Sequence, residues 1–146
     1  MTTNIMIVGV GGQGTLLASR ILGNTVINEG FDVKVSEVHG MSQRGGSVVT
    51  YVKYGEEVFS PVIDKGQADI ILAFEKLKES IDVKDVDALS LAIQAGNPKA
   101  VNVVLIGVMA KSTDIPYEKW MEALKSTVPE KFLEVNVKAF DLGYNL

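Results

Sequence analysis

Two glycine-rich stretches hold most of the polar groups in this chain that could take part in chemistry. The first, VGVGGQG at residues 8–14, has glycines at 9, 11 and 14, which is G-x-G-x-x-G spacing. The second, EVHGMSQRGGSV at residues 37–48, contains the only histidine, His39, and three glycines. The first pattern is typical of phosphate binding, and the second supplies donors for an anion. Both need a scaffold that places the two loops.

The first stretch has the features of a dinucleotide-binding loop. There Gly9 would allow the tight turn, Gly11 would let the backbone approach a pyrophosphate, and Gly14 would let strand and helix pack closely. The N-terminus of the following helix attracts phosphate charge. Glu37 lies where such domains place the acid that binds a ribose. The pattern therefore favours a bound nucleotide.

Two observations leave that ligand open. Gly12 and Gln13 put an extra glycine and an amide side chain at the apex, and no hydride-transfer residues follow downstream. A phosphate-binding or backbone-binding surface and a simple strand-to-helix turn are the alternatives. We expect the surface, formed by Gly11, Gly12, Gln13 and Gly14.

The second stretch is the less generic one. Its donors are Ser42, Gln43, Arg44, Ser47 and the amides around Gly45 and Gly46. Such consecutive amides can form an anion-binding nest to which Arg44 adds a charged fork, although a surface ion pair is the alternative for Arg44. His39 has no evident carboxylate or nucleophile as a partner, so we interpret it as a hydrogen-bonded residue at a strand end. We therefore predict no catalytic residue in this chain.

Composition excludes several kinds of chemistry. The 146 residues are enough for one domain with a core, and 47% of them are hydrophobic, with a mean hydropathy of +0.20. Without cysteine the chain has no disulfide, no thiolate catalyst and no iron–sulfur ligand, and one histidine rules out a multi-histidine metal site. A net charge of −4 disfavours nucleic acid. We expect a cytoplasmic protein that contacts no membrane and whose apolar excess is covered by a partner.

Hydrophobic patterns predict an α/β fold with a single domain over residues 1–146. Strands are expected at 4–9, 32–38, 47–55, 56–63 and 68–74, and VKDVDAL at 83–89 is a candidate for one more. A helix at 13–29 between the first two strands predicts a parallel βαβ unit, and Gly55 predicts a β-hairpin between 47–55 and 56–63. The run at 68–74 is expected at a central parallel position. EKLKESI at 75–81 would be a short helix or turn.

The rest of the chain is predicted to be helical. One helix ends at Gly96, Asn97 and Pro98 start a second that continues to about Lys111, Pro116 opens a third, and Pro129 opens the last. The second of these is apolar on nearly every side and should therefore be buried.

Three segments together resemble a known family. They are NIMIVGVGGQGTLLASRIL, DVKVSEVHGMSQRGGSVV and DALSLAIQAGNPKAVNVVLIGVMA. They are similar to the gamma subunit or domain of 2-oxoacid:ferredoxin oxidoreductases, and SEVHGMSQRGG points to the beta subunit of the indolepyruvate branch. The resemblance implies a Rossmann-like three-layer domain with a mostly parallel sheet, a β-hairpin and a helical C-terminal part.

The resemblance also implies a division of labour. A larger catalytic alpha subunit would carry thiamine diphosphate and iron–sulfur clusters, oxidatively decarboxylate an aryl 2-oxoacid to an acyl-CoA and pass electrons to ferredoxin. This chain would hold none of these cofactors, and coenzyme A would lie at a shared site. The two loops would line the face toward partner and ligand, and Asn102 would be a structural or interface hydrogen-bonder. A stand-alone dinucleotide-binding or regulatory module, and a purely structural scaffold, are the alternatives.

One departure from the family lies between ADIILAFEKLKES and VDALSLA. Relatives continue there with a further strand, a loop and a helix, whereas only IDVKD intervenes in this chain. A parallel crossover needs about a dozen residues, so the connection here is barely long enough. The chain is either a shortened member of the family or one from which residues are missing.

Overall fold

The computed structural model describes residues 1–41, 45–74 and 85–146. A four-stranded sheet has the order β2-β3-β1-β4. Its strands are β1 (Thr2–Val10), β2 (Asp32–His39), β3 (Ser47–Gly55) and β4 (Ile70–Ala73). The helices are α1 (Thr15–Asn28), α2 (Ala88–Ala95), α3 (Val101–Ala110), α4 (Tyr117–Thr127) and α5 (Glu130–Tyr144), and the 3₁₀ turn η1 (Pro98–Ala100) leads into α3.

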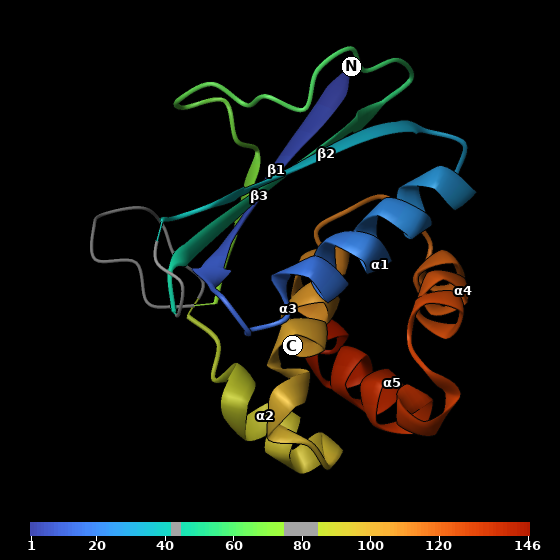
Figure 1. Cartoon of the computed structure of the whole chain (residues 1–146). Coiled ribbons are helices and arrows are strands. Elements are labelled where there is room, and N and C mark those ends of the chain that lie inside the picture. The colour runs from blue at the N-terminus through green and yellow to red at the C-terminus, as the bar shows by residue number, and fades with distance from the viewer. Residues whose placement is uncertain (42–44, 75–84) are drawn as a thin grey trace.

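The sheet is mixed and mostly antiparallel, so the predicted mostly parallel sheet is wrong. β3 pairs antiparallel with both β1 and β2, and β4 pairs parallel with β1. β1 and β2 run in the same direction around α1, as the βαβ pattern indicated, but β3 lies between them (Figure 1). The reason is the short connection at 40–46, which is long enough for an antiparallel return but not for a parallel crossover.

The hairpin predicted around Gly55 is also wrong, because residues 56–69 form no strand. A Cβ on Gly55 would lie 2.7 Å from the carbonyl oxygen of Met1, so this glycine allows close approach to the start of β1 rather than a turn. Downstream, the Val58 amide donates to Asp32 Oδ2 at 2.9 Å, which fastens the connection to β2. The hairpin in this protein is therefore β2–β3.

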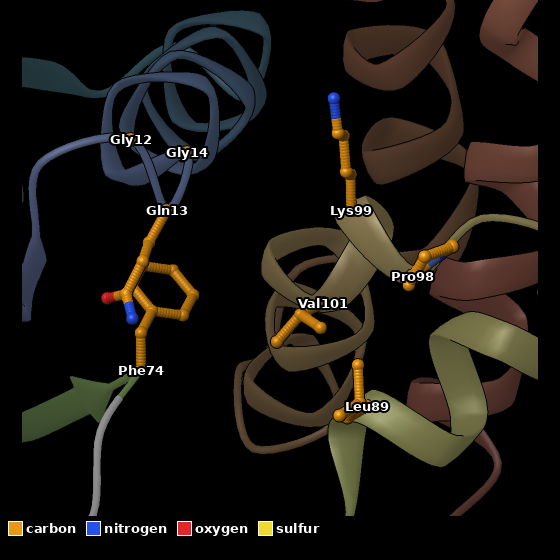
Figure 2. A pocket seen from close by; sticks show the side chains of 8 residues that line it. All are labelled: Gly12, Gln13, Gly14, Phe74, Leu89, Pro98, Lys99 and Val101. Carbon is orange, nitrogen blue, oxygen red and sulfur yellow. The ribbon is translucent and has the colours of Figure 1, made fainter.

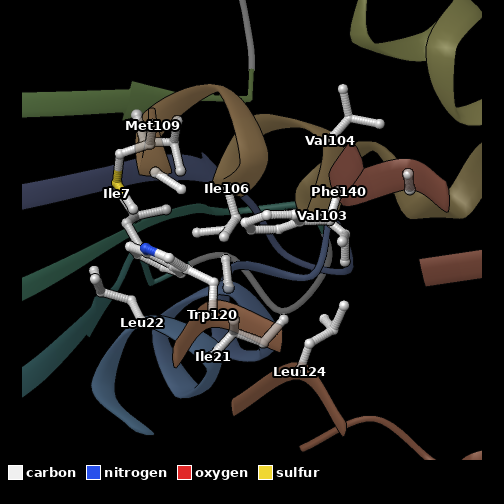
Figure 3. Packing of buried hydrophobic residues seen from close by; sticks show 14 of the residues in the cluster. Ile7, Ile21, Leu22, Val103, Val104, Ile106, Met109, Trp120, Leu124 and Phe140 are labelled. Carbon is white, nitrogen blue, oxygen red and sulfur yellow. The ribbon is translucent and has the colours of Figure 1, made fainter. Parts of the chain in front are cut away.

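The described helices lie on one side of the sheet, so this part of the chain has two layers where three were expected (Figure 1). α1 packs against β1, β2 and β3, and α4 packs on α1. The fully buried Ile5 and Ile7 point from β1 into the core between sheet and helices, where Trp120 and Phe140 are the largest buried side chains (Figure 3). Burial of these side chains is the main stabilising term of the fold.

The helical prediction for the C-terminal half is confirmed. α2 ends at Gly96, which has φ 110°, and Asn97 caps the next turn by accepting from the Lys99 amide at 2.9 Å. α3 is buried nearly all round because it crosses α5 at two glycines, Gly107 and Gly143, where a Cβ would collide with the backbone of the facing helix. No described helix has the length and apolar character needed to cross a membrane.

Two strand predictions need correction. The run at 68–74 does form β4 parallel to β1, but β4 is at the edge of the described sheet, not at its centre. Residues 85–87 form no strand and 88–89 begin α2, because the Asp87 side chain accepts from the Ser90 amide at 3.1 Å and caps that helix. The helix or turn predicted at 75–81 lies outside the described residues.

Candidate functional site

The two glycine loops meet at one end of the sheet. The Gly11 amide donates to the carbonyl oxygen of Gly46 at 3.0 Å, and the Gly40 amide donates to that of Ser47 at 2.8 Å. The first loop follows β1, and the second joins β2 to β3, whose antiparallel pairing places their shared end beside the end of β1. The structure thus brings together the described parts of both loops, although they are about 30 residues apart in sequence.

Gln13 closes the first turn from within. Its side-chain oxygen Oε1 accepts from the Val10 amide at 2.8 Å, and its own amide donates to the Val10 carbonyl at 3.2 Å. A Cβ on Gly9 would lie 2.8 Å from that Oε1, so Gly9 makes room for the amide side chain. Gly12 and Gly14 have φ of 91° and 84°, which only glycine adopts readily. Gln13 therefore shapes the loop, and the backbone at 11–14 forms its surface.

Asn102 fastens this loop to the helical layer. Its Nδ2 donates to the carbonyl oxygen of Gly14 at 3.2 Å, and a Cβ on Gly14 would collide with that Nδ2. Asn102 is 4% exposed and lies in the first turn of α3, while Gly14 is the N-cap of α1. The hydrogen bond therefore joins the beginnings of two helices.

A cleft of about 450 Å³ opens beside this junction, within the size range of small-molecule sites. Figure 2 shows the turn at Gly12–Gly14 and the Phe74 ring on one side, with Lys99 and Leu89 on the other. The remaining lining residues are Pro98 and Val101. α1 and the η1–α3 segment both begin here, so two helix N-termini and one ammonium group give the cleft a positive character.

Sequence reasoning missed three residues of the cleft: Phe74, Leu89 and Lys99. They lie at the end of β4, in α2 and in η1, so only the tertiary fold brings them to the first glycine loop. Lys99 did carry a signal, because it directly follows the Asn97-Pro98 helix start, where a cation next to an N-terminus has no structural benefit.

His39 does have a carboxylate partner, so the expectation that it lacks one is wrong. Its Nε2 lies 2.6 Å from Glu37 Oε1, and the hydroxyl of Thr50 donates to Glu37 Oε2 at 3.2 Å. Residues two apart on a strand share a face, which is why Glu37 and His39 meet on β2. Glu37 is thus engaged by two neighbours, and β3 separates it from β1. This placement does not suit a ribose-binding acid next to the first loop.

The centre of the second loop falls on residues that the structure does not describe. Ser42, Gln43 and Arg44 lie there, so their predicted role as ligand contacts remains a prediction. Gly45, with φ 65°, and Gly46 are described and border the first loop. Among the described residues, no group of three or more His, Asp or Glu side chains could hold a metal ion.

An α/β sheet with a glycine turn opening a helix beside a polar cleft defines a ligand-binding α/β domain. The chain belongs to the pyruvate ferredoxin/flavodoxin oxidoreductase family, whose model matches residues 4–84 and 76–146.

Individual relatives agree with this assignment. Indolepyruvate oxidoreductase subunit IorB of Pyrococcus horikoshii is 36% identical, with 96% of this chain and 93% of that protein covered. IorB of Archaeoglobus fulgidus is 32% identical over 99% of this chain and 95% of its own length. The crystal structure of a keto/oxoacid ferredoxin oxidoreductase gamma subunit from Geobacter sulfurreducens PCA superimposes with a TM-score of 0.83 and 26% identity, covering 98% of this chain and 96% of that one.

The comparison also locates the departure from the family. The alignment with the Pyrococcus protein spans 188 positions, so at least 42 of them have no counterpart in this 146-residue chain. The two family matches meet at residues 76–84, directly after β4. This agrees with the shortening predicted between β4 and α2.

Proposed function

We propose that this chain is the gamma-type subunit of a 2-oxoacid:ferredoxin oxidoreductase that acts on indolepyruvate or another aryl pyruvate. The observation that carries the proposal is the 36% identity to an indolepyruvate oxidoreductase subunit over nearly the whole chain. A larger, cytoplasmic alpha subunit holds thiamine diphosphate, which decarboxylates the oxoacid, and the iron–sulfur clusters that pass electrons to ferredoxin. With no cysteine in its sequence, this chain leaves those clusters to the partner.

The contribution of this chain is a binding surface for coenzyme A, which accepts the acyl group. Coenzyme A carries a pyrophosphate and a third phosphate next to adenine and a partly apolar arm. The amides at Gly12 and Gly14, the start of α3 and the Lys99 ammonium suit its phosphates, and Phe74 and Leu89 suit its less polar parts. The cleft thus offers both kinds of contact.

A solved structure of similar fold supports this choice of ligand. A 2-oxoglutarate:ferredoxin oxidoreductase from Magnetococcus marinus, with 2-oxoglutarate, coenzyme A and succinyl-CoA bound, contains a region that matches this chain with a TM-score of 0.79. The match covers 99% of this chain and 30% of that one at 16% identity, so the likeness concerns the fold.

Reconstitution tests the proposal. We expect this chain, mixed with its large subunit, to restore indolepyruvate-dependent reduction of ferredoxin in the presence of coenzyme A. Lys99→Ala should raise the KM for coenzyme A at least fivefold and leave the KM for the oxoacid unchanged. The matched control Lys125→Ala, an exposed lysine on α4, should behave like the wild type. No ferredoxin reduction in the reconstituted mixture contradicts the proposal.

A stand-alone dinucleotide-binding module remains the rival function. The pairing of Glu37 with His39 and Thr50 disfavours it, because the acid expected to hold a ribose is already engaged. Calorimetric titration of the isolated chain with NAD(H) separates the two, since micromolar binding would favour the rival.

A further inference from the structure

One face of the sheet has no helical layer in the described part of the chain. Neighbouring strands place two apolar rows there: Val38, Val49, Val8 and Ala73 in one, and Ser36, Tyr51, Met6 and Ile71 in the other. We call these eight residues the open face. Their side chains alternate with the core residues of the same strands, so they point away from the helices.

Exposure on this face is high for its composition. Val38 is 53% exposed and Ile71 is 37% exposed, while the inward-facing Ile5, Ile7 and Val52 are fully buried. Next to it, the connection at 56–69 exposes Phe59 by 86% and Val62 by 62%. A contiguous apolar surface of this kind marks an interaction site in a soluble protein.

The open face borders the place where the chain is shorter than its relatives. The missing positions, at least 42 in number, follow β4, which is the edge strand of this face. The relatives therefore have residues within their own chain that start beside the open face, and this chain does not. Something outside the described chain has to cover the surface.

From this we infer that a segment of the large catalytic subunit covers the open face, an inference that rests on the proposed function. The size of the face argues against a second copy as the occupant. Four strands about 4.8 Å apart and six residues of about 3.3 Å each give roughly 300–400 Å². A stable interface needs about 800 Å² from each partner, so two copies stacked face to face on this surface would fall short.

A large subunit can reach the required area by continuing onto Phe59 and Val62. Charge defines the chemistry of its docking segment further. Lys34 at the rim is paired with Asp32 at 2.6 Å, whereas the half-buried Lys53 has no ion-pair partner among the described residues. The docking segment is therefore apolar, with a carboxylate that faces Lys53.

Binding of the purified large subunit to three variants tests the inference. Ile71→Glu introduces a charge into the open face, Lys53→Glu reverses the rim charge, and Phe132→Glu is the control on α5, where Phe132 is 43% exposed. We expect Ile71→Glu and Lys53→Glu to weaken binding at least tenfold, and Phe132→Glu to bind within twofold of wild type. Each variant is first checked for an unchanged circular dichroism spectrum.

Hydrogen exchange in the wild-type complex supplies a test that needs no substitution. The amides of β4 should exchange at least tenfold more slowly in the complex than in the free chain. If the wild type does not bind the large subunit, the proposed function fails. If it binds but the three variants bind equally and β4 gains no protection, the docking inference fails and the function stands. Self-association of the free chain that Ile71→Glu abolishes would identify a second copy as the occupant and overturn the inference.

Discussion

Gly14→Ala tests the junction between the first glycine loop and the helical layer. Gly14 has φ 84°, and a Cβ at this position would collide with Asn102 Nδ2. The substitution therefore imposes backbone strain and also displaces the side chain that joins α1 to α3. The two effects can be separated because neighbouring glycines share only one of them or neither.

The expected magnitude follows from these contributions. A non-glycine residue in the left-handed region costs about 1–2 kcal/mol. Displacing Asn102 from the Gly14 carbonyl leaves a side chain that is 4% exposed without this partner, which costs a further 1–3 kcal/mol or so. We expect Gly14→Ala to lower the free energy of unfolding by about 2–5 kcal/mol. At roughly 2–4 °C per kcal/mol for a chain of this size, Tm falls by about 5–15 °C.

Thermal and urea unfolding of the isolated chain measure the effect against two controls. Gly12 has φ 91° but nothing within 4 Å of its Cβ position, so Gly12→Ala should cost only the strain of about 1–2 kcal/mol. Gly11 does not have a positive φ and faces only the Gly46 carbonyl at 4.0 Å, so Gly11→Ala should be neutral or slightly stabilising.

A double-mutant cycle with Asn102→Ala isolates the collision. In the Asn102→Ala background, Gly14→Ala should cost no more than Gly12→Ala does, because the colliding amide is gone. Equal losses in both backgrounds would refute the idea that Asn102 and Gly14 act as a unit.

Three further predictions concern the helices. Gly143→Ala at the α3–α5 crossing should destabilise the chain by about 3 kcal/mol or more, since its Cβ would meet backbone, whereas Gly23→Ala in α1, with open space, should stabilise it by about 0.5–1 kcal/mol; urea unfolding measures both. Burial, followed by the hydrogen bond to Asp141 at 2.6 Å, raises the pKa of Tyr117 to about 12, so its contribution to stability is complete below pH 10 and is lost as the pH rises through 12; Tyr117→Phe should abolish this loss in an alkaline unfolding series. The Ser90 hydroxyl and amide hold the pKa of Asp87 below its usual value, so α2 should lose amide protection as the pH falls below 3.8, and Asp87→Ala should show that reduced protection already at pH 7.

Local features of the fold could be predicted because neighbouring residues decide them. Gly30 and Gly96 end their helices with φ of 86° and 110°, and Asn97 caps the turn before α3, as their positions in the sequence indicated. The turn at residues 9–14 was recognisable for the same reason. Pairing of distant strands is a different matter, because it depends on which connection closes first.

Gly55 shows why the strand pairing was misjudged. A glycine between two apolar runs predicts a turn, but here it permits close contact with Met1 at the start of β1. The seven-residue connection at 40–46 held the better information, since a link that short can return a strand only antiparallel. Glu37 and His39 held a comparable signal, because a strand places residues two apart on the same face.

The cleft at Lys99 shows the opposite limit. Phe74, Leu89 and Lys99 come from three separate elements, and no spacing along the chain relates them to Gly12. What brings them together is the contact of Asn102 with Gly14, which sets where α3 begins relative to α1. The bond that fixes the loop therefore also fixes the distance between its amides and Lys99. A ligand with several phosphates would respond to that distance, so the stability of the junction and the affinity of the cleft should change together in the Gly14 and Asn102 variants.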